Sequence, residues 1–255
     1  MRPSHSEIRM KQNIYDNPEL FKGYSQLRRH GAGLNAALEW PALYSMLPPL
    51  SGLRVLDLGC GFGKWSRLMR EQGAASVIGI DISTRMLERA RAENAIDGIT
   101  YLNCAIEDAA FDPASFDLVT SSLAFHYVER FDFVCANVAR WLKQGGAFIF
   151  SVEHPILTAN PDNLEGWCCD AAGAKRHWAV DNYRDEGARN TRWFVEGVIK
   201  YHRTIETYLN TLIDAGLAIA RVLEPEGTPE FVRTRPEALE ERRRPPFLLI
   251  SARRV

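Results

Sequence analysis

Short apolar runs alternate with helix-like segments through the middle of the chain. Five runs of six or seven residues are apolar on both faces, and the segments between them repeat apolar residues every three or four positions. Strands buried on both faces form parallel sheets whose connections are helices. We therefore expect an α/β, doubly wound fold with right-handed crossovers. The expected strands are 54–59, 76–81, 99–104, 116–122 and 147–153, and the expected helices are 64–73, 84–95 and 132–146.

The two flanks of this region have other patterns. Residues 34–47 have helical spacing, with Pro41 as a break or as the start of a second helix. Residues 154–195 are irregular, and a segment of about forty residues of this kind is usually a functional cover or disordered. Its aromatic residues argue against disorder. Regular structure is expected again at 197–202, in a helix over 204–216, and in two runs, 217–225 and 247–254, that pair antiparallel at the sheet edge.

The first strand runs into a glycine-rich loop in the stretch VLDLGCGFGKW. Gly59, Gly61 and Gly63 alternate there, and glycine allows a sharp turn and close approach of a ligand. Doubly wound sheets bind ligands at this edge, and Asp81, at the end of the next strand, is placed to accept hydrogen bonds from a ribose diol. The glycine-rich loop and Asp81 together predict a nucleoside site. The dinucleotide fingerprint G-x-G-x-x-G is not met, because Lys64 stands at its third glycine.

Composition narrows the class of partner. The 31 Lys and Arg nearly balance the 32 Asp and Glu, so no strong field favours nucleic acid or a membrane surface. We interpret the basic run at 241–246 as solvated surface. The polar start and the lack of any stretch of about 20 apolar residues predict a cytoplasmic protein without a membrane span. Five cysteines without CxxC spacing suggest neither a disulfide framework nor a zinc site.

Four segments in order resemble the class I S-adenosylmethionine (SAM)-dependent methyltransferases. They are D-x-G-x-G-x-G at 57–63, Asp81, SFDLVTSSLAFHYV at 115–128 and LKQGGAFIFSV at 142–152. Flanking stretches such as YSQLRRHGAGLNAALEWPAL, DNYRDEG and RPPFLLIS resemble a bacterial small-molecule subgroup, similar to methyltransferase types 11 and 12. The resemblance implies one domain, 1–255, with a helical cap 1–50 and an inserted cover 154–195. It also implies a Rossmann-like, mostly parallel sheet of seven strands in the order 3-2-1-4-5-7-6, with an antiparallel last strand.

The resemblance also implies a SAM site, with S-adenosylhomocysteine as product. Asp57 would orient the loop or bind the cofactor's amino group through water. After the third strand, the family usually has an acid that accepts from the adenine amino group, and Ala105 stands at that position here. Ile106 would then contact adenine. The lost acceptor is replaced by Glu107, by Asp108 or by neither. Arg28 would pair with the methionine carboxylate or form a surface ion pair. The residues expected to bind the cofactor are Asp57, Gly59, Gly61, Gly63, Asp81, Ile82, Ile106, Glu107, Ser122, Tyr15, Tyr24 and Arg28, with Leu123 beside Ser122 at the methionine.

Methyl transfer from a sulfonium requires that the protein position the reactants and exclude water, more than that it supply a nucleophile. We expect no metal. Where a base is needed, a histidine suits neutral pH, and the candidates are His154 and His126, the latter alternatively packed beneath the cofactor. The expected acceptor is an N, O or C atom of a small molecule, bound by a monomer or homodimer. The alternatives are an RNA (tRNA) methyltransferase, which the balanced charge disfavours, and a SAM-binding module without catalysis. Four further residues are candidates for the substrate pocket, or else form part of a structural core: Trp178, Tyr183, His202 and Arg203.

Overall fold

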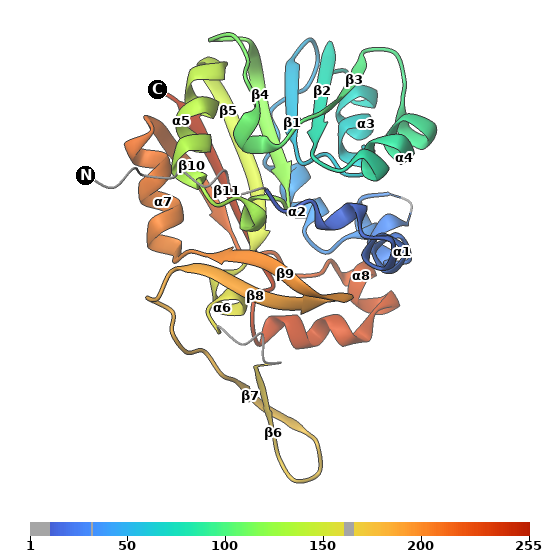
Figure 1. Cartoon of the computed structure of the whole chain (residues 1–255), viewed down its shortest axis with the longest axis vertical. Helices are drawn as coiled ribbons and strands as arrows, with labels where there is room; N and C mark the ends of the chain where they lie inside the picture. Colours follow the sequence, from blue (N-terminus) through green and yellow to red (C-terminus); the bar gives the residue numbers. More distant parts are fainter. Residues whose placement is uncertain (1–10, 32, 161–165) are drawn as a thin grey trace, which may run out of the picture.

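The computed structural model describes residues 11–31, 33–160 and 166–255. The other residues, which belong to the expected cap 1–50 and cover 154–195, lie outside the described part. A seven-stranded sheet in the order β10-β11-β5-β4-β1-β2-β3 forms the centre (Figure 1). Its strands are β1 (Arg54–Leu58), β2 (Ser76–Asp81), β3 (Ile99–Asn103), β4 (Phe116–Ser122), β5 (Leu142–Glu153), β10 (Leu217–Leu223) and β11 (Phe247–Arg254).

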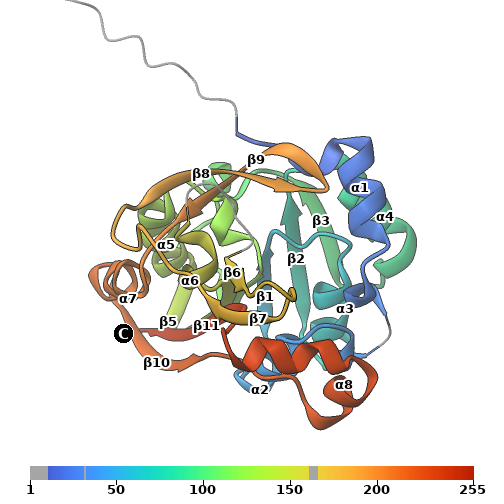
Figure 2. The same ribbon diagram turned by 90° about the horizontal axis from the view of Figure 1, so that it is seen from below.

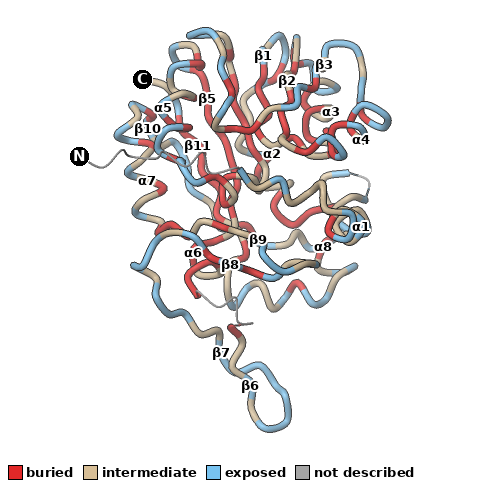
Figure 3. Tube along the Cα trace, viewed as in Figure 1, coloured by how far each residue is buried: buried red, intermediate tan, exposed pale blue. Residues whose placement is uncertain are grey.

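The sheet confirms the expected strand order, because four further strands, β6 to β9, lie outside it. Strands β1 to β5 pair in parallel, whereas β11 is antiparallel to both β5 and β10. The antiparallel pairing of the last two runs is as predicted, with β10 at the edge and β11 inside it. The buried centre of the sheet is visible in Figure 3.

Helices cover both faces of the sheet because its strands are apolar on both. Leu56 and Phe148 belong to one buried cluster, which includes side chains of α5 (Phe131–Trp141) and α7 (Ile205–Asp214). Their neighbours Val55 and Ile149 face the opposite cluster, with α3 (Lys64–Glu71) and α2 (Trp40–Ser45). Because successive side chains of a strand point to opposite faces of the sheet, each strand contributes side chains to both cores. On the β3 side, α4 (Thr84–Asn94) packs against the sheet and is capped by Ser83, whose hydroxyl accepts from the Met86 N–H at 3.1 Å.

Two predicted boundaries change. The pattern at 34–47 divides into a 3₁₀ turn (Leu34–Ala36) and α2, in which Pro41 occupies the first turn. The helix expected over 132–146 ends at Trp141, and β5 begins at once. Between β4 and β5 the register shifts from Phe116↔Leu142 to Leu118↔Ala147, so the glycines that suggested a helix stop instead form an irregularity inside a strand.

The irregular stretch after β5 contains two hairpins. A single helical turn, α6 (Pro155–Thr158), precedes β6 (Trp167–Cys169) and β7 (Lys175–Trp178), and then β8 (Gly187–Trp193) pairs with β9 (Val195–His202). Figure 1 shows β6–β7 projecting from the body, and Figure 2 shows the same hairpins from below. The β8–β9 hairpin, α1 (Pro18–Ser25) and α8 (Pro229–Thr234) lie on the side where the parallel strands end.

Arginines from the basic run at 241–246 support the projecting hairpin. The Arg243 guanidinium lies 4.6 Å from the ring centre of Trp167, and that of Arg244 lies 4.3 Å from the ring centre of Trp178. Part of the run expected to be solvated therefore packs on aromatic rings. None of the described helices combines the length and the apolar character that crossing a membrane requires.

Candidate cofactor and substrate site

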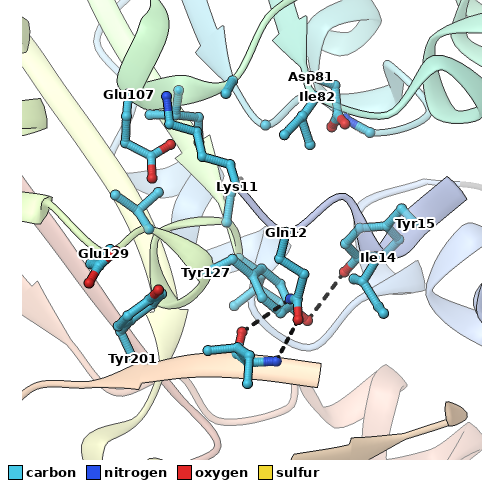
Figure 4. Close-up of a pocket in the computed structure, with 18 of the residues that line it drawn as sticks. Lys11, Gln12, Ile14, Tyr15, Asp81, Ile82, Glu107, Tyr127, Glu129 and Tyr201 are labelled. Carbon is cyan, nitrogen blue, oxygen red and sulfur yellow. Dashed lines mark hydrogen bonds between the residues drawn. The ribbon is translucent and has the colours of Figure 1, made fainter. Parts of the chain in front are cut away.

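A cavity of about 280 Å³ lies where β1, β2 and β4 end (Figure 4). Figure 4 shows Asp81 and Ile82 on one side of it and Tyr127 and Tyr201 on the other. Nine of the predicted cofactor residues line it, namely Tyr15, Tyr24, Gly59, Gly61, Asp81, Ile82, Ile106, Glu107 and Ser122, and Leu123 lines it as well. The further lining residues are Lys11, Gln12, Ile14, Met86, Ala105, Ala124, Tyr127, Val128, Glu129, Ala188, Ile199 and Tyr201.

The three loop glycines meet different surroundings. All have positive φ, a conformation that disfavours other residues. A Cβ on Gly59 would lie 2.5 Å from that of Ala124, and one on Gly63 would lie 2.2 Å from the Tyr101 hydroxyl, whereas one on Gly61 would meet nothing within 4 Å. Gly61 therefore leaves its space open to a ligand. Gly63 does not line the cavity, and it is required for packing at the start of α3.

Asp81 is a buried carboxylate with two backbone donors. One oxygen accepts from the Gly61 N–H and the other from the Ser83 N–H, both at 2.9 Å. Burial raises the pKa of Asp81 to about 6, although both hydrogen bonds oppose the shift. Each carboxylate oxygen retains a lone pair, so the group can still accept from a ligand in the cavity.

Asp57 lies behind the loop rather than in the cavity. It is 1% exposed, and its carboxylate accepts from the Ser66 hydroxyl of α3 at 2.5 Å. Burial raises the pKa of Asp57 to about 7. Of the two roles predicted for Asp57, orientation of the loop matches this geometry, whereas the structure does not bring the side chain to the ligand side.

The segment after β3 places only one of its two acids at the cavity. Ala105, Ile106 and Glu107 line the cavity, whereas Asp108 does not and instead forms an ion pair with Lys11. Of these two acids, Glu107 is the one whose side chain lines the cavity, and a role at the adenine remains a prediction for it.

Residues 11–16, which we call the strap, contribute four of the residues that line the cavity. The side-chain amide of Gln12 bonds both backbone groups of Ile199, donating to its C=O at 3.3 Å and accepting from its N–H at 2.7 Å. At the other end, Asp16 accepts from the Ser83 hydroxyl at 2.6 Å. The strap thus joins β9 to the start of α4, and Tyr15 faces the cavity from it.

Arg28 is not at the cavity. Its guanidinium lies 3.6 Å from the Glu237 carboxylate, and both side chains are mostly exposed, which is the surface ion pair predicted as the alternative. Its neighbour Arg29 is more buried and pairs with Glu39, which is 1% exposed, at 2.6 Å. The sequence does not distinguish two adjacent arginines, because the local turn decides which one faces inward.

Both histidines proposed as bases lie outside the cavity lining. His126 is 2% exposed, its Nδ1 accepts from the Glu153 N–H at 3.4 Å, and burial lowers its pKa to about 4. His126 is thus packed in the interior and does not line the cavity. His154 caps α6 by accepting from the Ile156 N–H, and its Nε2 lies 2.9 Å from Glu224. Neither ring is placed to take a proton from an acceptor in the cavity.

The four predicted substrate residues also have structural contacts away from the cavity. The indole of Trp178 donates to the Ile156 C=O, and the Tyr183 hydroxyl accepts from the Ile205 N–H. His202 lies between the Thr158 hydroxyl and the Tyr183 carbonyl. Arg203 donates to the carbonyls of Phe125, Val128 and Glu129, and so holds the segment after β4 from outside.

The wall opposite Asp81 consists largely of residues that the sequence did not single out. Tyr127 belongs to the fourth-strand motif, but the histidine beside it attracted the prediction. Ile199 and Tyr201 lie on β9, which reaches the cavity only through tertiary packing. In the strap, Gln12 has no motif around it, so no sequence signal indicates its role.

The lining is compatible with SAM. The Ser122 hydroxyl oxygen is buried without a hydrogen-bond partner among the described residues, and Leu123 has a positive φ of 55°. An unpartnered buried hydroxyl and a strained backbone at a strand end are typical of ligand sites. Together with the open side of Gly61 and the carboxylate of Asp81, they provide donors and acceptors along one wall. Among residues 11–31, 33–160 and 166–255, no three His, Cys, Asp or Glu side chains come together as metal ligands.

Comparison with known proteins identifies the family. Residues 56–150 match the methyltransferase domain family Methyltransf_11. A structure of a SAM-dependent methyltransferase from Mesorhizobium loti is 49% identical, with a TM-score of 0.81, over 87% of this chain and 100% of the other. An uncharacterized protein from Haemophilus influenzae is 38% identical over 96% of this chain and 98% of its own. A malonyl-[acyl-carrier protein] O-methyltransferase from Enterobacter lignolyticus is 34% identical over 51% of this chain and 48% of its own. The chain therefore belongs to the class I SAM-dependent methyltransferases.

Proposed function

We propose that the protein transfers the methyl group of SAM to an N, O or C atom of a small molecule held in this cavity, without a metal ion. The observation that carries the proposal is that one cavity contains both an adenosine-type wall, with Asp81 and Gly61, and a tyrosine-rich wall opposite. The relative from Enterobacter lignolyticus is named for a carrier-bound malonyl acceptor, which also favours a metabolic acceptor here.

The predicted cofactor residues have distinct roles in this proposal. Asp81 accepts hydrogen bonds from the ribose, Ile106 and Glu107 contact the adenine, and Ser122 with Gly61 borders the methionine part. Tyr15 and Tyr24 close the site. Asp57 and Gly63 act indirectly, by fixing the loop on α3.

SAM supplies the electrophilic methyl group, so the chain's own residues have three tasks: they bind, orient and exclude water. The strap and β9 exclude water by closing one side of the cavity. Arg203 fixes the segment that carries Tyr127 and Val128. Among residues 11–31, 33–160 and 166–255, no histidine lines the cavity, so an acceptor that needs a base would use a carboxylate or water if it draws on these residues.

Calorimetric titration with SAM and S-adenosylhomocysteine, followed by a turnover assay over a metabolite panel, tests the proposal. Micromolar binding with S-adenosylhomocysteine formation on a small molecule supports it. Binding without turnover on any compound favours the non-catalytic module. Turnover only on tRNA, with affinity that falls steeply as salt rises, favours the RNA alternative. No SAM binding refutes the proposal.

A further inference from the structure

Two tyrosine hydroxyls meet in the wall opposite Asp81. The Tyr15 hydroxyl donates to the Tyr127 hydroxyl at 3.3 Å, and both residues line the cavity (Figure 4). A hydroxyl carries one hydrogen and two lone pairs, so a pair that shares one hydrogen bond retains one hydrogen to donate. Among the described residues, no acceptor for the Tyr127 hydrogen is found. The pair is therefore a hydrogen-bond donor facing a ligand.

This donor is held rigidly. The Tyr15 ring packs edge-on against Tyr24, Tyr127 and Trp193, with centroid distances of 5.1, 5.9 and 6.1 Å. Tyr127 lies in a short turn whose following carbonyls accept from the guanidinium of Arg203. Packing on one side and hydrogen bonds on the other fix the hydroxyl pair in the cavity wall, which is how binding groups are preorganised.

The rest of the lining includes apolar side chains, the polar side chains of Gln12 and Tyr201, and four charged groups. Ile14, Val128, Ala188 and Ile199 form the apolar part of the same wall. The charged lining groups on other elements are Lys11, which pairs with Asp108, and the carboxylates of Asp81, Glu107 and Glu129. Asp81 lies across the cavity, and Glu129 is exposed and has an interaction of its own.

We propose that the methyl acceptor is a carboxylic acid with a small apolar body, whose carboxylate accepts a hydrogen bond from the Tyr15–Tyr127 hydroxyl pair. This inference rests on the proposed methyltransferase function and specifies its substrate class. A carboxylate is already a nucleophile at neutral pH, which fits a cavity whose described lining contains no histidine. Transfer forms a bond from carboxylate oxygen to methyl carbon while the carbon–sulfur bond breaks with its electron pair, giving a neutral ester and thioether without moving a proton.

The protonation state of the pair agrees with a donor role. Burial raises the pKa of both Tyr15 and Tyr127 above the ordinary value, so both phenols stay neutral at physiological pH. A neutral phenol donates a hydrogen bond and is a poor base. The hydrogen that the pair retains can be used only by a ligand with a lone pair, and hydrogen bonds to charged acceptors such as a carboxylate are the stronger kind.

Matched ligand pairs on the SAM-loaded protein test the inference. Acetate, hexanoate and benzoate are compared with ethylamine, hexylamine and benzylamine by ligand-observed NMR, and any methylated product is identified by mass spectrometry. We expect at least one carboxylate to bind more tightly than its matched amine. Its Kd should rise tenfold or more in Tyr127→Phe, which keeps the ring. Tyr44→Phe, which removes an exposed hydroxyl bonded only to Gln72, should leave the Kd unchanged.

The inference is overturned by amines that bind as tightly as the carboxylates, by no carboxylate binding, or by equal carboxylate affinity in Tyr127→Phe and the parent protein. SAM affinity is measured in the same samples by calorimetry. SAM binding with turnover on amines alone would leave the methyltransferase function intact and remove only the carboxylate class, whereas absence of SAM binding would refute the function itself.

Discussion

The carboxylate of Asp81 accepts a hydrogen bond from the backbone N–H of Gly61 at 2.9 Å, across the gap between β2 and the loop after β1. The acid proposed to bind ribose therefore also holds the glycine loop in its open-sided conformation. Burial of Asp81 raises its pKa to about 6, so the empty protein can carry this group in either protonation state near neutrality. Cofactor binding and proton release should consequently be linked.

Replacing Asp81 with Asn should weaken SAM binding by about 1.5–3 kcal/mol, the usual loss for a charged acceptor of hydrogen bonds. In the parent protein, SAM affinity should fall as the pH drops below about 6, because protonation removes the charged acceptor. The Asp81→Asn variant should show a flat profile between pH 5 and 8. Calorimetry at several pH values measures both effects. Asp112→Asn, at an exposed site, is the matched control, and an unchanged affinity in Asp81→Asn would remove Asp81 from the site.

Substitutions at two neighbouring glycines should separate stability from binding. Gly63→Ala places a methyl group 2.2 Å from the Tyr101 hydroxyl at a φ of 74°, so we expect the free energy of unfolding to fall by about 2–4 kcal/mol. Gly61→Ala meets no atom within 4 Å, so only backbone strain of about 1–2 kcal/mol is expected. Its methyl group enters the cavity, however, and should weaken SAM binding. Urea unfolding and calorimetry on both variants give the comparison; equal SAM affinity in Gly61→Ala and the parent would contradict it.

The sheet was predictable from sequence because its strands are apolar on both faces, as Val55 and Leu56 show by packing into opposite cores. The cofactor wall was predictable because glycine and an acid at strand ends carry a local signal. The wall opposite Asp81, proposed to bind the acceptor, was not, since it depends on distant pairings such as that of Gln12 with Ile199. Histidines were predicted from their chemistry alone, whereas burial and capping contacts, as at His154, decide where a ring lies.

The buried carboxylate of Asp57 should make the stability of the empty protein depend on pH. Its pKa rises from about 4 in the unfolded chain to about 7 in the folded protein, so the folded state binds the proton more tightly. The stability it contributes is complete below about pH 4 and is lost as the pH rises through about 7. Relative to Asp57→Asn, the parent protein should lose up to about 1.4 kcal/mol per pH unit within this window. Urea unfolding between pH 4 and 8 tests this, and a difference that does not change with pH would contradict it.

The strap should control how fast the cofactor leaves. Gln12 makes two hydrogen bonds to Ile199, each worth about 0.5–1.5 kcal/mol, so Gln12→Ala should raise the SAM dissociation rate by about tenfold. The amide hydrogen of Ile199 should also exchange faster, because it loses its acceptor. Stopped-flow release and hydrogen exchange measure the two effects, with Gln144→Ala, at an exposed position in β5, as control. Faster exchange at Ile199 with unchanged release would mean that the strap is bound to β9 but is not the gate, and that the cofactor leaves past another part of the cavity wall.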